Sequence, residues 1–205
     1  INKNCYSLEK INNKPLIFYS IDEALKINEF KKVILSTADL KLINLVKKKY
    51  KDKIFYHKRP KHLAEQNIDF KEAVINAINK FEKKKIDLIV IMTYENPLRR
   101  SFYISQAISN LIIHDSDSVI GTVTDIDNNY YKYSEKGLKL ISNEKRHKLR
   151  LEKNLILKDV GAFTVYKYKS YLKSSNLKTT SIVLNENDSF IINTKKDLEI
   201  LRELM

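Results

Sequence analysis

DLIVIMTYENPLRR, at residues 87–100, decides the fold, because an apolar strand runs here into a polar, basic turn. Five of its first six residues are apolar, as in a strand that is buried on both faces. The turn holds Pro97, one of three prolines in the chain, and then Arg99 and Arg100. Ligands of open parallel α/β sheets bind beyond the carboxyl ends of the strands. We therefore expect this turn to face a ligand site.

Strands and helices alternate around this stretch through about residue 125. Amphipathic helices are expected at 14–27, 38–50, 69–84 and 101–115, and short apolar strands at 31–37, 52–60, 87–92 and 117–124. The helix at 69–84 is the clearest, since its apolar residues follow the i, i+3, i+4, i+7 spacing of one helical face. This alternation predicts an α/β fold with a mainly parallel sheet and helices on both faces.

The rest of the chain departs from this alternation. Residues 126–158 are polar, rich in tyrosine and weakly periodic, so we expect an inserted arm of hairpins rather than a second domain. A strand and a helix are expected over 160–175. A strand, a turn with a Thr194 cap and a final amphipathic helix are expected over 190–205. Residues 1–205 are therefore expected to form a single domain.

The composition limits the classes of partner and the cellular setting. The net charge of +13 has two interpretations, an anionic partner or lysines on solvated faces. The lysine runs lack the interleaved aromatic residues of nucleic-acid surfaces, so no nucleic-acid partner is expected. No apolar run approaches the ~20 residues of a membrane span, so no membrane is expected. A single cysteine, Cys5, excludes an internal disulfide and predicts a cytoplasmic protein.

A series of short motifs resembles the acylneuraminate cytidylyltransferases, the CMP-sialic acid synthetase-like or CMP-sugar synthetase family. In chain order they are NKN (2–4), NKPLIFYSI (13–21), ILSTADLKLI (34–43), KRPKHLAEQ (58–66), MTYENPLRR (92–100), DSVIGTV (117–123), VGAFTVY (160–166) and IINTKKDLEI (191–200). All three prolines fall inside these motifs, as do Gly121 and Gly161. The resemblance covers essentially the whole chain. It implies a Rossmann-like nucleotide-diphospho-sugar transferase fold with an inserted arm.

The resemblance also implies an activity and a set of binding residues. Such enzymes are nucleotidyltransferases that transfer CMP from CTP to a nonulosonic, sialic-acid-like 2-keto sugar acid, release pyrophosphate and require Mg2+. We accordingly expect CTP and an acidic sugar as partners, and a homodimer formed through the arm at 126–158. No catalytic residue is assigned, because no Ser/His/Asp arrangement or phosphate-binding glycine loop is present. The implied nucleotide-binding residues are Lys3, Asn4, Arg59, Ala64, Ile68 and Phe70, and the implied sugar-binding residues are Thr93 and Arg150.

Several positions depart from the family pattern. Two aspartates that the family associates with metal binding align with Ile191 and Asn193, so Asn193 is the remaining metal candidate, with one neutral oxygen to offer. Thr93 stands where the family has a sugar-supporting glutamine, and Glu95 follows it in a loop that would face an acidic sugar. The family's glycine-rich triphosphate loop precedes its KN motif, whereas this sequence opens at Ile1. We expect that loop and the first strand to lie outside this sequence, because losing a central strand would leave a sheet edge unpaired.

Two functions from different classes follow from these matches and departures. The retained NKN, KRP and PLR elements favour an active cytidylyltransferase with altered sugar specificity. The lost aspartates favour a catalytically weak or inactive homologue that serves as a nucleotide-binding, sugar-binding or interaction domain.

Overall fold

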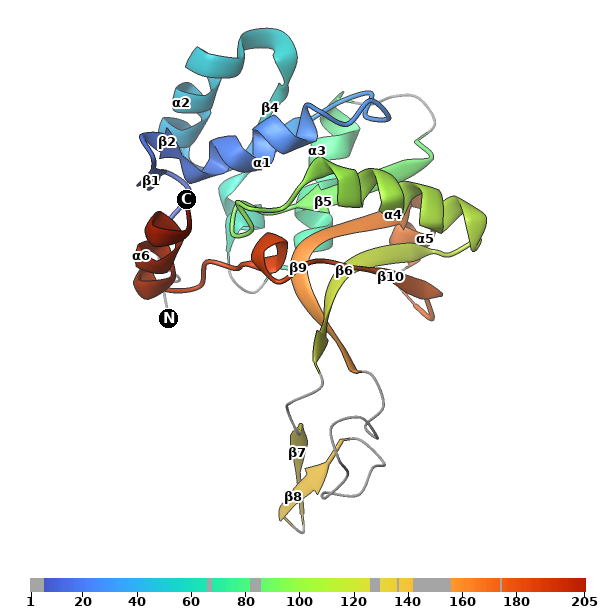
Figure 1. The fold of residues 1–205 in the computed structure, drawn as a ribbon. Coiled ribbons are helices and arrows are strands. Elements are labelled where there is room, and N and C mark those ends of the chain that lie inside the picture. Colours follow the sequence, from blue (N-terminus) through green and yellow to red (C-terminus); the bar gives the residue numbers. More distant parts are fainter. Residues whose placement is uncertain are drawn as a thin grey trace.

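The structure, a computed structural model, describes residues 6–65, 68–81, 86–125, 130–135, 137–141, 156–173 and 175–205. Within these ranges, helices pack on two groups of strands, and a narrow β extension projects from the body (Figure 1). The predicted α/β class, with helices beside parallel strand pairs, is confirmed.

The first group of strands is a parallel pair, β3 (Ile34–Thr37) and β4 (Phe55–Lys58). Helices α1 (Leu16–Ala24) and α2 (Leu40–Tyr50) cover one face, while α3 (Phe70–Phe81) contacts both strands from the other. Alternation along the strands explains this division, since successive side chains point to opposite faces. Leu35 and Tyr56 pack with the apolar residues of α1 and α2, and His57 contacts α3. The buried core of this layer consists of Ile17, Phe18, Ile21, Leu42, Val46, Tyr50 and Ile54.

The second group is a four-stranded sheet in the order β10 (Thr179–Val183), β6 (Ser118–Asp125), β9 (Ile156–Lys167) and β5 (Leu88–Met92). β10 and β6 are parallel, but β9 runs antiparallel to both of its neighbours. The expectation of a mainly parallel sheet therefore misses β9. Its direction follows from the arm, because the chain leaves along β6 and returns along β9. Helix α4 (Ser101–Ile113) packs on this sheet and buries Ile104, Ala107, Leu111, Val119, Ala162, Phe163 and Val165.

The arm carries a hairpin, as predicted. β7 (Tyr131–Ser134) and β8 (Gly137–Leu140) pair antiparallel, and Gly137 takes a positive φ of 98° at the turn, where a residue without a Cβ is favoured. In Figure 1 the hairpin lies beyond the ends of β6 and β9, away from the helices. The predicted arm also includes residues 142–155, which lie outside the described part of the chain.

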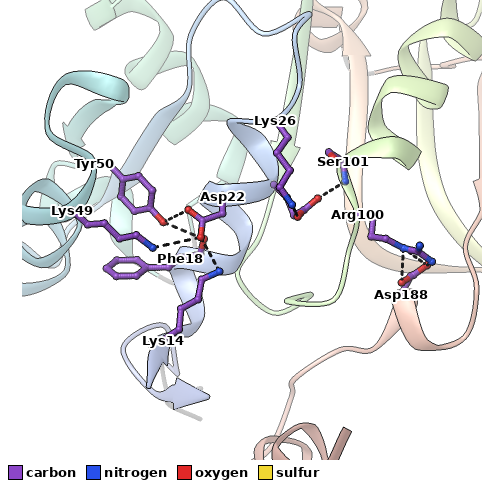
Figure 2. Close-up of polar contacts among 10 residues, drawn as sticks. Lys14, Phe18, Asp22, Lys26, Lys49, Tyr50, Arg100, Ser101 and Asp188 are labelled. Atoms are coloured by element: carbon purple, nitrogen blue, oxygen red, sulfur yellow. Dashed lines mark hydrogen bonds and ion pairs between the residues drawn. The ribbon is translucent and has the colours of Figure 1, made fainter. Parts of the chain in front are cut away.

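Helix α1 joins the helices of the two groups through adjacent carboxylates (Figure 2). Asp22 accepts hydrogen bonds from Tyr50, at the end of α2 (2.6 Å), and from Lys14 (2.7 Å). Glu23 accepts the backbone N–H of Ser101, the first residue of α4, at 2.7 Å. Consecutive residues of a helix differ by about 100° in direction, so neighbouring carboxylates can reach different partners. The carboxylate of Glu23 also places a negative charge at the positive end of α4.

The C-terminal region differs in part from its prediction. The strand expected within 190–193 is wrong, since the short helix η4 (Asn187–Ser189) is followed there by chain without regular secondary structure. The sheet position is taken instead by β10, which the sequence analysis did not predict. The Thr194 cap is confirmed, because its hydroxyl accepts from Asp197 N–H and Asp197 accepts from Thr194 N–H. This capping box begins α6 (Lys195–Leu204).

Short elements complete the fold. β1 (Lys10–Ile11) and β2 (Lys14–Pro15) form a tight hairpin before α1, with Asn12 and Asn13 at positive φ as in a type I′ turn. Pro15 is the N-cap of α1 rather than part of its first turn. The others are η1 (Lys51–Lys53), η2 (Lys61–Ala64) and α5 (Tyr168–Lys173).

Candidate functional site

The carboxyl ends of β3 and β4 form the edge at which the sequence places the nucleotide. Thr37 lies opposite Lys58 in the parallel register, and the next N–H, of Arg59, donates to Thr37 O at 2.9 Å. The ladder therefore extends one hydrogen bond past the strands. This bond fixes the backbone of Arg59 at the sheet edge, where ligands of such folds bind.

The side chain of Arg59 is held in place by one serine. Its Nη2 donates to Ser36 O at 3.0 Å and its Nε to Ser36 Oγ at 3.4 Å. The guanidinium also lies over the ring of Phe70, 5.8 Å from the ring centre. Burial lowers the pKa of Arg59 from its usual value, yet arginine stays charged near neutral pH. No carboxylate forms a salt bridge with Arg59 within the described residues, so its charge can attract an anion.

The segment after Arg59 lines the same edge. Ala64 ends η2 and is exposed, Ile68 is half-buried, and Phe70 begins α3 with half of its surface exposed. The ring of Phe70 is thus shared between Arg59 and solvent. The structure brings Phe70 and Arg59 together, as the sequence analysis expected, whereas residues 66–67 of this segment lie outside the described ranges.

Arg99, at the end of the opening stretch, is a core residue. Only 1% of its surface is exposed. Its guanidinium donates to Ala162 O, to Ser20 Oγ at 2.9 Å and to Thr93 O at 3.1 Å. Burial lowers the pKa of Arg99 to about 10, with Glu23 acting in the opposite direction. Arg99 therefore holds α1, β9 and its own loop together and does not face a ligand.

Arg100 is also engaged within the protein. Its Nε donates to both carboxylate oxygens of Asp188 at 3.0 Å (Figure 2). Tyr103 OH donates to the same carboxylate at 2.8 Å. Asp188 is buried in η4 and raises the pKa of Arg100 through this bond. The expectation that the basic end of this loop faces a ligand is therefore wrong for Arg99, whereas Arg100 keeps 60% of its side chain exposed while it is bonded to Asp188. The guanidinium N–H groups of both arginines donate to acceptors that are close only in the folded chain, so the local sequence does not reveal these bonds.

Asn96, in the middle of the same loop, is buried and hydrogen-bonded to two other segments of the chain. This side chain is 2% exposed, and its amide donates to Val160 O and Phe190 O at 3.4 Å. Thr93 is half-buried, and its carbonyl accepts from Ser20 Oγ at 2.8 Å. The proposed contact of Thr93 with a sugar stays a prediction, since its backbone is used by the fold and its hydroxyl lies 3.5 Å from the Asn96 carbonyl oxygen.

The metal candidate Asn193 lies in a segment that is bonded to the loop after β5. Ile192 N–H donates to the backbone carbonyl of Glu95 at 2.8 Å, so the backbone of this loop runs beside residues 191–193. Asn193 is exposed, and its own N–H donates to Asp197. No group of three or more His, Cys, Asp or Glu that could hold a metal ion occurs in the described residues. One carboxylate and one amide do not form a protein cage, but Mg2+ commonly binds through one or two carboxylates plus substrate phosphates. The donor set fits that mode.

Three expected binding residues cannot be placed. Lys3 and Asn4 of the nucleotide set and Arg150 of the sugar set lie outside the described residues. Their assignments stay predictions.

The family profile decides the relationship. The sequence profile described as "Cytidylyltransferase" matches residues 1–203. The chain belongs to the cytidylyltransferase family. This confirms the family at the level of cytidylyltransferases and leaves the sialic-acid branch open.

A curated relative matches part of the chain. The chain is 30% identical over 138 residues to the post-translational flagellin modification protein B of Campylobacter coli, in a match that covers 65% of this chain and 56% of the relative. The chain thus spans about half the length of that curated relative.

Solved structures support the Rossmann-like fold. The 4-diphosphocytidyl-2C-methyl-D-erythritol synthase of Anaerococcus prevotii superposes with a TM-score of 0.70 at 11% identity, covering 95% of this chain and 90% of that one. A CMP:2-keto-3-deoxy-manno-octonic acid synthetase in complex with CTP gives a TM-score of 0.69 at 15% identity, covering 98% and 91%. At these identities the likeness concerns the fold.

None of the helices in the described residues combines the length and the apolar character that a membrane crossing requires.

Proposed function

We propose that this cytidylyltransferase-family protein transfers the CMP group of CTP to the hydroxyl of an acidic 2-keto sugar, with release of pyrophosphate. The observation that carries the proposal is the guanidinium of Arg59, held at the carboxyl end of β4 with no carboxylate in a salt bridge to it in the described part of the chain. Because the chain belongs to the cytidylyltransferase family, the ligand proposed for this guanidinium is a cytidine nucleotide. The structural likeness to a synthetase crystallised with CTP points the same way.

The reaction joins two anions, so the protein must offset their repulsion. The sugar hydroxyl oxygen bonds to the α-phosphorus of CTP, the bond from that phosphorus to the bridging oxygen breaks, and the hydroxyl proton is lost to base or solvent. Arg59 can donate to phosphate oxygens while Ser36 keeps its guanidinium in one orientation. Such preorganised charge lowers the cost of the transition state. The exposed half of the Phe70 ring offers a surface beside it for the nucleotide.

The sugar is proposed to be a nonulosonic, sialic-acid-like acid. The relative in Campylobacter coli modifies flagellin, as its name states, and such acids fit a transferase that serves protein modification. Thr93 and Arg150 are the proposed sugar contacts. The Glu95 carboxylate would repel the sugar carboxylate unless a cation binds to Glu95.

Mg2+ is proposed to bind at the edge formed by Glu95 and Asn193 together with the CTP phosphates. The hydrogen bond from Ile192 to Glu95 keeps these two positions together. When bound, the ion would neutralise charge that develops on the phosphates. Glu95 thereby replaces a carboxylate that the family carries in the 191–193 segment.

The arm is proposed to form a homodimer. Its hairpin presents large side chains to solvent: Tyr133 is 89% exposed, Leu138 63% and Ile141 60%. Tyr133 and Leu138 are direct partners across the hairpin, and exposed apolar side chains that gather in this way favour an interface.

A second function is favoured by one observation at the altered motif. Ile191 packs against the apolar cluster beneath α4, where the family has a metal-associated aspartate. If the position is committed to packing, the protein binds a nucleotide or sugar without turnover.

Pyrophosphate release separates the two functions. The protein is supplied with CTP, Mg2+ and a panel of sialic-, legionaminic- and pseudaminic-type acids. The proposed transferase releases pyrophosphate with at least one acid. Binding of CTP without release across the panel supports the second function. The absence of any CTP-induced rise in melting temperature overturns the transferase and the nucleotide-binding form of the second function.

A further inference from the structure

A row of polar side chains with the buried His57 at its centre lies behind Arg59. Ser36 and His57 are direct partners in the β3–β4 register, so their side chains emerge side by side on one face. Arg59 is two residues beyond His57 and shares that face. Asn76 reaches the row from α3, which packs on the same side. The distances are 2.9 Å from Ser36 Oγ to His57 Nδ1 and 2.9 Å from His57 Nε2 to Asn76 Oδ1.

The hydrogen bonds of this row have a single direction. Asn76 offers its carbonyl oxygen, so His57 Nε2 must carry the hydrogen. In the neutral ring, Nδ1 is then an acceptor, and the hydroxyl of Ser36 donates to it. With its hydrogen committed to His57, Ser36 Oγ turns a lone pair to Arg59 Nε at 3.4 Å. Each atom thereby fixes the role of the next one.

The surroundings of His57 keep its ring neutral. Only 1% of the residue is exposed, and the ring of Phe81 packs against it edge-on. Burial lowers the pKa of His57, the bond to Asn76 opposes this, and the charges of Lys80 and Arg59 lower it further. A neutral ring is the form that accepts from Ser36.

We propose that Ser36, His57 and Asn76 position Arg59 for the triphosphate of CTP, with the neutral His57 ring setting the orientation of the Ser36 hydroxyl. This inference rests on the proposed function, because it takes Arg59 to be the phosphate-binding cation. The three residues act through Arg59 and need not touch the nucleotide. Arginine depends on orientation more than lysine does, because its planar fork must match phosphate oxygens in two directions.

A double-mutant cycle on CTP binding tests the proposal. Titration calorimetry on the whole chain compares wild type, Ser36→Ala, Arg59→Ala and the double variant, and Ser118→Ala serves as the matched control. Ser118 is likewise a strand serine with a hydrogen-bonded hydroxyl, which pairs with Thr179 in the second sheet. Ser36→Ala should weaken CTP binding about three- to tenfold, as expected for one hydrogen bond to a charged group. It should have no further effect once Arg59 is gone.

Two histidine variants add a readout that a structural role alone would not change. His57→Asn keeps an acceptor near the position of Nδ1, and His57→Leu fills the space without one. CTP affinity should be retained better in His57→Asn than in His57→Leu at equal melting temperature.

The outcomes distinguish a failure of this inference from a failure of the proposed function. If Arg59→Ala leaves CTP affinity unchanged, the nucleotide assignment of Arg59 fails. If Arg59→Ala weakens binding while Ser36→Ala matches Ser118→Ala, or if the effects of Ser36 and Arg59 simply add, the positioning row is wrong and the proposed function stands. Equal loss in both His57 variants also contradicts the row.

Discussion

Two arginines at strand ends have opposite environments in this molecule. Arg99 follows β5 and is enclosed, with its guanidinium bonded to Ala162, Ser20 and Thr93. Arg59 follows β4 and is half-buried, with its guanidinium bonded to Ser36 and facing the ring of Phe70. The guanidinium of Arg99 donates to protein acceptors in place of water. The guanidinium of Arg59 is only half-buried and can still bind another molecule. The position of an arginine after a strand therefore does not by itself assign a ligand contact.

Loss of the enclosed arginine should have the largest effect. Arg99→Ala leaves the carbonyls of Ala162 and Thr93 without this donor and opens a cavity in the core, so unfolding should become easier by about 3–5 kcal/mol. Urea denaturation measures the change. Arg202→Ala, which removes an exposed ion pair to Glu9, is the control and should cost less than about 1 kcal/mol. Similar values for the two variants would contradict the core role of Arg99.

Loss of the half-buried arginine should affect binding instead. Arg59→Ala should weaken CTP binding about 10- to 100-fold, the value of charge-assisted hydrogen bonds to phosphate. The free energy of unfolding should change by less than about 1 kcal/mol, since Ser36 keeps its strand bonds. A variant that unfolds easily but binds CTP normally when folded would reverse the comparison between the two arginines.

Glu95 lies in the same loop as Arg99, yet it is proposed to bind Mg2+ at the ligand site. Glu95→Gln should raise the Mg2+ concentration needed for half-maximal pyrophosphate release about tenfold, as loss of a metal-site carboxylate commonly does. CTP binding measured without Mg2+ should be unchanged. Adding Asn193→Asp to this variant should recover part of the loss. An unaltered Mg2+ requirement in Glu95→Gln would exclude Glu95 from the metal site.

Asp22 should show the smallest effect, through the helix that joins the two regions. Although partial burial opposes ionisation, hydrogen bonds from Lys14 and Tyr50 lower the pKa of Asp22 below its usual 3.8. The stabilisation is therefore complete above pH 3.8 and is lost as the pH falls through the lower pKa of the folded state. Asp22→Asn should cost about 0.5–1 kcal/mol at pH 7 and less than that near pH 2. Denaturation curves at the two pH values measure it, and an equal cost at both would refute the charge role.

The sequence predicted the regular parts of this structure well, because their signals are local. The apolar spacing over 69–84 predicted α3, and the Thr194 cap predicted the start of α6. β9 could not be oriented from sequence, since its direction depends on where the arm returns. β10 was missed because its alternation is short and lies in polar surroundings.

The candidate site was predictable only where a residue's role is set by its own position. Arg59 was found from the strand end and the family motif. The enclosure of Arg99 and the pairing of Arg100 with Asp188 arise from residues about 60 to 90 positions away, which no local pattern reports. His57 was overlooked for the same reason, because its importance comes from Ser36 on another strand and Asn76 on a helix.

Hydrogen exchange with and without CTP tests the central claim most directly, since it reports both arginine segments in one experiment on the unmodified protein. The account predicts that CTP slows exchange over residues 59–70, and that amides 96–100 are slow beforehand and unchanged. New protection over 96–100 with none over 59–70 would show that the ligand edge lies at the other arginine.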